Sequence, residues 1–333
     1  MRKNYSLKLL ASILSVNNYY IKRGKYQLDG IINIYKYQGW TSSDVVVKLR
    51  HILKCKKVGH TGTLDPMAEG VLPICVGRAT QLSDYIMDKT KVYEAELVLG
   101  ITTDTLDQSG NMTSFKETHI DQNELESVLK TFVGEIEQIP PMYSAIKYNG
   151  KKLYELARKG EIVERKPRRV TIYSIEIVDK INDSHYYIKV HCSKGTYIRS
   201  LCADIGEKLG CGACMGDLVR IACDNYTQED SMDLDYVENM VKNNDFSFIS
   251  DMEKAVMKYP AVEIKPEFAF HFLNGLDAAP NRYLSDKNLS EGEIVRVHVN
   301  GNFCAMASVK VGQLHVKNIL VDVNEFLGGV NNG

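Results

Sequence analysis

The stretch Gly59-His60-Thr61-Gly62-Thr63-Leu64-Asp65-Pro66 decides how the rest of this 333-residue chain is interpreted. It sets a carboxylate, Asp65, in a loop of small residues, with an imidazole, His60, shortly before it. The two glycines allow a sharp turn and the close approach of a ligand, and the closing proline fixes the backbone. The pattern predicts that Asp65 is held in place by its loop and that the loop forms part of a site.

Other interpretations of this loop follow from residue types alone. Loops of this composition are most often ordinary turns. A P-loop requires Gly-Lys-Ser/Thr after its first glycine and four further residues, and no lysine follows Gly62. A phosphatase-type aspartate nucleophile is plausible chemistry, but the preceding Lys56-Lys57-Val58 offers neither a second acid nor a hydrophobic strand. The loop by itself leaves a structural turn and a nucleophile open.

The sequence that continues from this loop resembles the motif around the catalytic aspartate of the TruB family of tRNA pseudouridine synthases. The matching run, GHTGTLDPMAEGVLPICVGRATQ, extends from Gly59 to Gln81. Three further segments follow in the family's order: Lys91-Val92-Tyr93-Glu94, Pro140-Pro141-Met142-Tyr143-Ser144-Ala145-Ile146-Lys147 and Cys192-Ser193-Lys194-Gly195-Thr196-Tyr197-Ile198-Arg199-Ser200-Leu201. The resemblance spans about residues 29 to 322 and leaves the first 28 residues outside it.

The resemblance implies an isomerase that flips out the T-loop uridine at tRNA position 55 and converts it to pseudouridine. Asp65 matches the nucleophile, which would attack either the ribose or the base, and Arg199 matches the arginine that pairs with it. Tyr93 matches the aromatic residue that stacks on the flipped base and assists proton movement. The expected RNA-binding residues are His60 in the place the nucleotide leaves, Tyr197 and Leu218 in the base pocket, and Lys147 and Arg158 in a basic segment.

Plainer roles exist for most of these residues. A histidine in a loop is more often a surface group, and Tyr93 or Leu218 would ordinarily be read as core residues. A run of basic residues is usually a solvated face. Two rival functions also remain: a pseudouridine synthase acting on another RNA, such as a guide-dependent enzyme for ribosomal RNA, and a non-catalytic protein that binds or folds tRNA.

The distribution of charge agrees with an RNA partner even though the formal net charge is only −1. Residues 147–169 carry nine Lys/Arg against three Glu, whereas residues 229–254 carry eight acids against two lysines. A basic face can therefore coexist with a neutral total. In the family, the region of about 139–169 is an RNA-binding insertion that clasps the T-arm of tRNA.

Hydrophobic periodicity predicts an α+β fold. A helical stripe follows Thr41, alternation at Tyr93–Leu99 indicates a half-buried strand, and Asp121 with Glu124 resembles a capping box before a helix. Strands are expected at 170–178 and 186–192, then at 294–299, 303–309 and 314–321, with a hairpin turn at Asn300-Gly301.

These elements and the resemblance together define an expected domain organisation. We expect a basic extension at 1–28, a catalytic domain at 29–250 on a mixed, largely antiparallel sheet flanked by helices, and a small β-barrel PUA-like RNA-binding domain at 257–322. The family usually has proline where this chain has Tyr37, which puts the rigidity of that turn in doubt.

The remaining features exclude several protein classes. The eight cysteines lack the spacing of a disulfide framework, and Cys211 and Cys214, even with Cys202 and Cys223, make a weak case for zinc. The first 28 residues hold no clear cleavage site and no membrane span, so a targeting presequence, an RNA-touching extension or an unstructured start stay open. We expect a cytoplasmic monomer that needs no cofactor, metal, membrane or guide RNA.

Overall fold

The computed structural model describes residues 19–22, 25–87 and 90–330. Most of the predicted basic extension, residues 1–18 and 23–24, lies outside the described residues. Its described part is a hairpin of two antiparallel strands, β1 (Tyr19–Lys22) and β2 (Lys25–Leu28).

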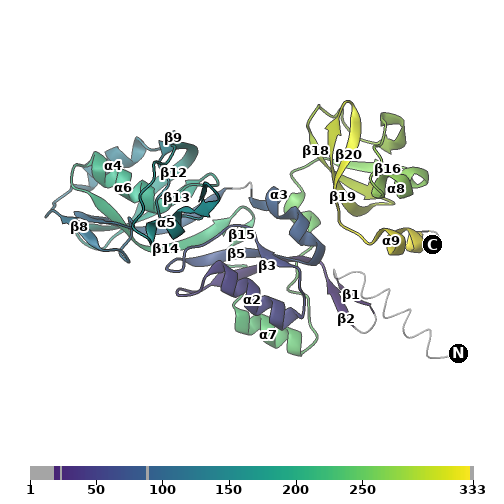
Figure 1. The fold of residues 1–333 in the computed structure, drawn as a ribbon, viewed down its shortest axis with the longest axis horizontal. Coiled ribbons are helices and arrows are strands. Elements are labelled where there is room, and N and C mark those ends of the chain that lie inside the picture. The colour runs from purple at the N-terminus through teal and green to yellow at the C-terminus, as the bar shows by residue number, and fades with distance from the viewer. Residues whose placement is uncertain (1–18, 23–24, 88–89, 331–333) are drawn as a thin grey trace.

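A nine-stranded sheet organises the larger part of the molecule (Figure 1). The strand order is β3-β5-β14-β6-β13-β12-β9, with β4 beside β5 and β15 beside β14. Pairing is antiparallel throughout except between β5 and β14, so the expected mixed, largely antiparallel sheet is confirmed. The strands are β3 (Gly30–Lys36), β4 (Val58–His60), β5 (Glu69–Val76), β6 (Lys91–Leu99), β9 (Gly134–Gln138), β12 (Arg168–Lys180), β13 (His185–Cys192), β14 (Ala213–Cys223) and β15 (Tyr226–Thr227).

Helices flank this sheet at both of its ends (Figure 1). Helices α2 (Ser42–Leu53) and α7 (Leu234–Lys242) lie side by side near β3 and β5. At the other end, α6 (Ile198–Lys208) packs against β14 and β6, and α4 (Gln122–Lys130) packs against β12 and α6. Shorter elements connect them: the 3₁₀ helices η1 (Gly77–Leu82) and η2 (Glu253–Val256), helices α3 (Ser83–Met87) and α5 (Leu153–Ala157), and strands β7 (Ile101–Thr103), β8 (Met112–Phe115), β10 (Lys147–Tyr148) and β11 (Lys151–Lys152).

The helix predicted after Thr41 is confirmed, and local chemistry explains its limits. Thr41 is the N-cap, and its hydroxyl and the Asp44 carboxylate form a reciprocal capping box. The helix ends where Lys54 takes a left-handed conformation with φ of 50°. The helix predicted at Asp121 also forms, as α4, but the expected capping box does not, because the Asp121 side chain accepts no capping hydrogen bond.

The strand predicted around Tyr93 forms as β6, but its expected alternation is wrong at Glu96, which is buried. This carboxylate accepts a hydrogen bond from the Asp217 backbone N–H and lies 2.7 Å from His185 Nδ1. A buried charge is tolerated where such partners satisfy it. All residues from Ala95 to Leu99 are buried, so both faces of β6 are covered along this part of the strand, and simple alternation no longer describes it.

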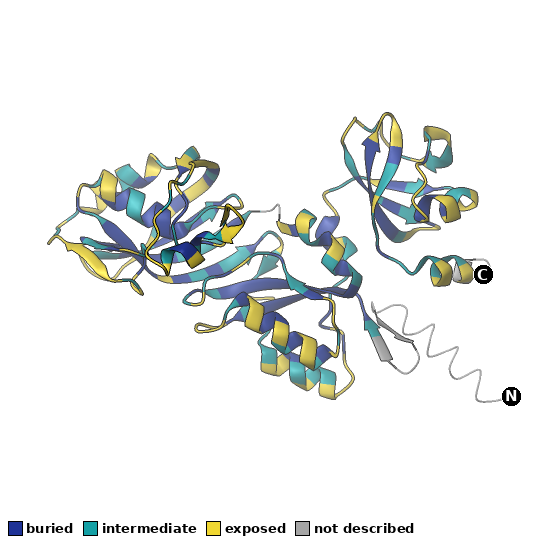
Figure 2. Cartoon of the chain, in the orientation of Figure 1, coloured by how far each residue is buried: buried dark blue, intermediate teal, exposed yellow. Residues whose placement is uncertain are grey.

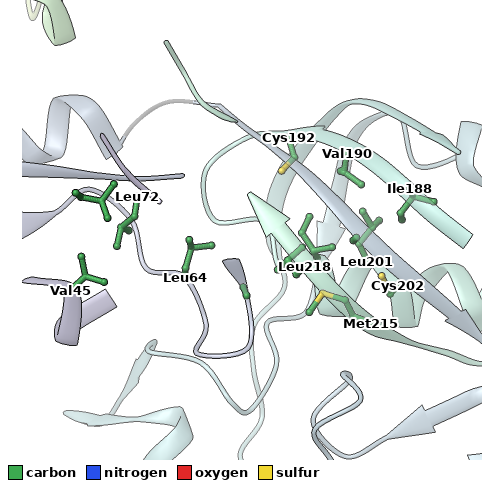
Figure 3. Packing of buried hydrophobic residues seen from close by; sticks show 14 of the residues in the cluster. Val45, Leu64, Leu72, Ile188, Val190, Cys192, Leu201, Cys202, Met215 and Leu218 are labelled. Carbon is green, nitrogen blue, oxygen red and sulfur yellow. The ribbon is translucent and has the colours of Figure 1, made fainter. Parts of the chain in front are cut away.

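One hydrophobic cluster joins the two ends of the sheet (Figure 2). Its members come from α2, β5, β13, β14 and α6, and Leu64 of the Asp65 loop is among them. In Figure 3, Leu64 lies between Val45 and Leu72 on one side and Leu218 on the other. The loop is therefore anchored in the core by an apolar side chain that is 3% exposed, next to an aspartate that is not buried.

The C-terminal unit has its own core and a five-stranded sheet in the order β17-β16-β18-β19-β20. The predicted strands 294–299, 303–309 and 314–321 correspond to β18 (Ile294–Val299), β19 (Asn302–Lys310) and β20 (Gln313–Ile319), joined first by the expected turn at Asn300-Gly301. The other elements are β16 (Ala261–Ile264), α8 (Pro266–Leu273), η3 (Pro280–Arg282), β17 (Tyr283–Leu284) and α9 (Val323–Val330). Among the described residues this sheet does not close, so the expected small barrel is not confirmed.

Candidate active site

The Asp65 loop runs from β4 to β5 and is tied at several points. Thr61 donates hydrogen bonds from its backbone N–H and its hydroxyl to the Pro73 carbonyl, each 3.1 Å long. The Leu64 N–H donates to the Ser42 hydroxyl at the start of α2, and that hydroxyl donates to the Leu64 carbonyl. These bonds leave the Asp65 side chain 39% exposed on a backbone that is held on both sides.

Lys36, at the end of β3, also holds this loop in place, and it is almost completely buried, with 1% of the residue exposed. Its ammonium donates to the carbonyls of Tyr37, Trp40, Pro66 and Ala68. Burial lowers the pKa of Lys36 to about 8, while the nearby Glu69 and Asp65 charges raise it. The turn at Tyr37, where a proline was expected, is thus held by lysine contacts that do not depend on a ring at that position.

Arg199 joins the Asp65 loop to a second acidic residue, Asp107. Its Nη2 atom lies 2.9 Å from Asp65 Oδ2, and its Nη1 atom lies 3.2 Å from Asp107 Oδ2. The guanidinium also donates to the carbonyls of Thr105 and Tyr143. Asp107 is 2% exposed and accepts further hydrogen bonds from Thr105 and Ser109. Arg199, at the start of α6, is therefore fixed from several sides and presents one N–H edge to Asp65.

A cavity of about 720 Å³ opens in front of this pair. It is lined by Asp65 and Arg199, by Tyr93 of β6, by Leu218 and Arg220 of β14, and by Tyr197 before α6. Burial raises the pKa of Tyr93 to about 12 and raises that of Tyr197, so both phenols are neutral at pH 7. The cavity combines a carboxylate with aromatic and apolar walls and falls within the size range of small-molecule sites.

Basic side chains surround the cavity. Lys91 is buried in its wall, and the exposed Lys194, Arg168 and Arg169 lie at its edge. Such a rim attracts a polyanion, while the walls suit a planar ring. The arrangement can hold one nucleotide of a nucleic acid with its ring next to a carboxylate, which is suitable geometry for nucleophilic catalysis.

Comparison with known families identifies the protein class. Residues 50–198 match the model of the TruB family pseudouridylate synthase N-terminal domain, and residues 199–257 match that of the tRNA pseudouridylate synthase B C-terminal domain. The chain belongs to the TruB family. It is therefore an RNA pseudouridine synthase, an isomerase, as the sequence analysis expected.

Individual TruB-family proteins cover most of the chain. The tRNA pseudouridine synthase B of Clostridium kluyveri is 49% identical over 83% of this chain and 93% of its own length. That of Clostridium perfringens strain 13 is 42% identical over 89% of this chain and all of its own. Among solved structures, an H/ACA RNP bound to a substrate RNA containing 2′-deoxyuridine has a TM-score of 0.69 at 25% identity, covering 89% of this chain and 86% of that one. A Cbf5-Nop10-Gar1 complex has a TM-score of 0.68 at 26% identity, with the same two coverages.

The structure brings five of the residues singled out from the TruB resemblance to one cavity: Asp65, Tyr93, Tyr197, Arg199 and Leu218. The other three lie outside its lining. His60 ends β4 beside a separate hollow formed with α2, and its Nδ1 accepts a hydrogen bond from the Gly62 N–H. Lys147 and Arg158 are exposed on the segment between β9 and β12, where the Arg158 guanidinium lies 5.5 Å from the centre of the Tyr154 ring.

Three residues of the site were not identified from sequence: Lys36, Asp107 and Arg220. Lys36 lies next to Tyr37, and the one unusual feature of this segment in the sequence is that Tyr37 replaces the family's proline. Asp107 lies in a turn rich in Thr, Asp and Ser, a composition typical of an ordinary loop. Arg220 lies in a largely apolar part of β14. A lone arginine inside an apolar run, as in residues 218–223, is an unusual signal and could have drawn attention to Arg220.

Two further observations concern metals and membranes. Within residues 19–22, 25–87 and 90–330, no three His, Cys, Asp or Glu side chains are grouped so that they could hold a metal ion. Over the same residues, no helix has the length and apolar character needed to span a bilayer.

Proposed function

We propose that this TruB-family enzyme converts the T-loop uridine at position 55 of tRNA to pseudouridine, with Asp65 as the nucleophile. The observation that carries the proposal is the pairing of a partly exposed Asp65 with a buried Arg199, 2.9 Å away, at the end of a cavity of nucleotide size. Aiming the carboxylate in this way is what covalent catalysis by an aspartate requires.

The reaction balances without a cofactor. The bond between ribose C1′ and uracil N1 breaks, the base turns, and C1′ bonds to C5. C5 loses its hydrogen as a proton and N1 gains one, so no electron is transferred to or from the RNA. Asp65 provides the temporary bond, to the ribose or to the base, that keeps the two fragments together. Tyr93 and Tyr197 are neutral at pH 7 and can enclose the flipped ring without adding charge.

We propose tRNA as the substrate because the relatives that are 42–49% identical carry the name tRNA pseudouridine synthase B. The basic rim at Arg168, Arg169 and Lys194 would take backbone phosphates. Lys147, Arg158 and the rest of the 139–169 segment would contact the T-arm, and His60 would fill the place left by the flipped nucleotide. We also propose that residues 257–322 form a PUA-like RNA-binding domain beside the catalytic domain of 29–250, and that the enzyme acts as a cytoplasmic monomer.

A second candidate is an enzyme that modifies another RNA with the help of a guide. It is favoured by the structural likeness to an H/ACA RNP bound to a substrate RNA. The sequence identity to those structures, 25–26%, is well below that to the tRNA pseudouridine synthases B. We therefore place the guide-independent tRNA enzyme first.

The test is position-resolved mapping of pseudouridine in an unmodified tRNA transcript, without guide RNA. The chain, its Asp65→Asn variant and a tRNA with cytidine at position 55 are compared, and RNA binding is measured in parallel. Product at position 55 from the unaltered chain alone supports substrate and nucleophile together. Product from Asp65→Asn would refute the nucleophile, product at another position would refute the target, and binding without product would favour a non-catalytic role.

A further inference from the structure

Within residues 27–87 and 90–328, the Arg220 side chain is the largest fully buried one, and it lines the cavity that contains Asp65. It is 1% exposed, lies on β14 two residues after Leu218, and lines the Asp65 cavity. In the described part of the chain, Arg220 forms no ion pair with a carboxylate, whereas Arg199 pairs with two. Removing a guanidinium from water without an opposite charge is unfavourable, so its position calls for an explanation.

The donors of Arg220 connect separate parts of the site. Its Nε donates to the Val71 carbonyl on β5 over 2.7 Å, and its Nη2 donates to the Gly62 carbonyl in the Asp65 loop over 3.2 Å. A Cβ placed on Gly62 would lie 3.6 Å from Arg220 Nη1, so the loop backbone packs directly on the guanidinium. On the adjacent strand β6, the residue opposite Arg220 is Tyr93.

Local geometry brings the backbone of Arg220 equally close to β5. A Cβ on Gly70 would lie 2.2 Å from the Arg220 carbonyl oxygen, and Gly70 has φ of 106°. This close approach occurs at the one parallel pairing of the described sheet, between β14 and β5. Neighbouring glycines thus allow close packing on Arg220 at two points: Gly70 on its backbone and Gly62 on its guanidinium.

We propose that Arg220 is a positioning residue, whose guanidinium fixes the Asp65 loop through Gly62 and the opposing Tyr93 on β6, so that nucleophile and base-stacking residue keep one relative geometry. This inference deepens the proposed function and rests on it. A hydrogen-bonding fork fits the role better than an apolar side chain, because it satisfies two backbone carbonyls on different elements at once. The structure gives Arg220 this role beside Arg199, which acts on Asp65 directly.

The test compares Arg220→Met, which removes charge and donors, with Arg220→Lys, which keeps the charge and one donor group. We expect kcat to fall about 100-fold in Arg220→Met, as a displacement near 1 Å at a reacting group does. We expect a fall of about tenfold in Arg220→Lys, with the Kd for tRNA unchanged within about threefold in both. Arg78→Gln is the matched control, because Arg78, in η1 directly after β5, is a mostly buried arginine that is paired with Asp29 and does not line the cavity.

A second readout does not depend on activity. Burial and the Arg220 charge both lower the pKa of His60. In an NMR titration of the histidines, the His60 pKa should therefore rise in Arg220→Met and stay unchanged in Arg220→Lys and Arg78→Gln. If the unaltered chain makes no pseudouridine, the proposed function fails, and this titration still reports on Arg220.

Several results would overturn the proposal. One is a folded Arg220→Met variant with kcat within threefold of the unaltered chain. Another is a His60 pKa that does not move in that variant. Equal loss of kcat in Arg220→Met and Arg78→Gln would show that any buried arginine of the domain matters and that positioning is not specific. If Arg220→Met does not fold, the kcat and Kd of Arg220→Lys decide, because a normal kcat there excludes a need for the fork.

Discussion

Replacing Asp107 by asparagine should slow the chemical step without abolishing RNA binding. Asp107 Oδ2 lies 3.2 Å from Arg199 Nη1, and the carboxylate is 2% exposed. At an effective dielectric constant of about 20, two unit charges at this distance attract each other by about 5 kcal/mol. Asparagine keeps the shape and can still accept from Ser109, but it removes the charge and can turn an NH₂ group toward the guanidinium.

Part of that attraction is recovered, because Arg199 keeps Asp65, a partly exposed carboxylate, as a partner. We expect the activation free energy to rise by about 2–4 kcal/mol, which slows the reaction by about 30- to 1000-fold. The reason is orientation: without the Asp107 charge, Arg199 is held less firmly and can move, together with Asp65, out of the position from which we propose that Asp65 attacks.

The assay is single-turnover release of tritium from tRNA labelled at uridine C5, since bonding of C5 to the ribose expels that hydrogen. Asp104→Asn is the matched control, because Asp104 lies in the same turn but bonds to Asn111 and not to Arg199. A folded Asp107→Asn variant that reacts within threefold of the unaltered chain would refute the reasoning. So would an equal loss in Asp104→Asn.

Two other predictions concern residues that hold the loop. The pKa of Lys36 in the folded chain, about 8, is below its ordinary value of 10.5. Between these two pH values the folded chain therefore binds fewer protons than the unfolded chain, and stability rises with pH. The contribution of Lys36 to stability is complete above pH 10.5 and is lost as the pH falls through 8. Urea unfolding should therefore show the unaltered chain gaining stability over Lys36→Met between pH 7.5 and pH 10, and a constant difference would contradict the burial of its charge. Gly70→Ala should lower the free energy of unfolding by about 3 kcal/mol or more, because the new methyl would meet Arg220 backbone atoms at 2.2 and 2.8 Å. Gly39→Ala is the control: its φ of 84° also strains an alanine, but no atom stands in the way of the methyl, so the loss should be smaller.

Sequence predicted those parts of the fold that local chemistry determines. The helix after Thr41 followed from a capping box and an apolar stripe, and the hairpin at Asn300-Gly301 followed from a turn that needs positive φ. The order of strands in the nine-stranded sheet did not follow from sequence, because pairings such as that of β14 with β5 join residues about 150 positions apart. The small barrel expected for the C-terminal strands is not confirmed for the same reason. The three predicted strands do not tell which other strands pair with their outer edges.

The residues of the candidate site also form two groups: those that a sequence motif reveals and those that only folding brings to the site. Asp65, Tyr93 and Arg199 were identified because they stand in recognisable motifs, and the cavity contains all three. Asp107 and Arg220 act through contacts that exist only after folding: one is a turn residue that meets α6, and the other is a strand residue that meets a loop carbonyl. No local pattern distinguishes such residues from a solvated turn or an ordinary strand.

The charges of the site explain why a chain of net charge −1 can act on a polyanion. Four cationic side chains are buried in or beside the cavity: Lys36, Lys91, Arg199 and Arg220. Carboxylates lie among them: Asp65 and Asp107 are paired with Arg199, Glu69 is near Lys36, and Asp84 lines the cavity. Burial lowers the pKa of both Lys36 and Lys91, and the nearby Arg220 charge lowers it further. A phosphate group at the rim would meet the exposed Arg168, Arg169 and Lys194, so these charges, and not the buried cations that hold the loop, would supply most of the electrostatic part of the RNA affinity.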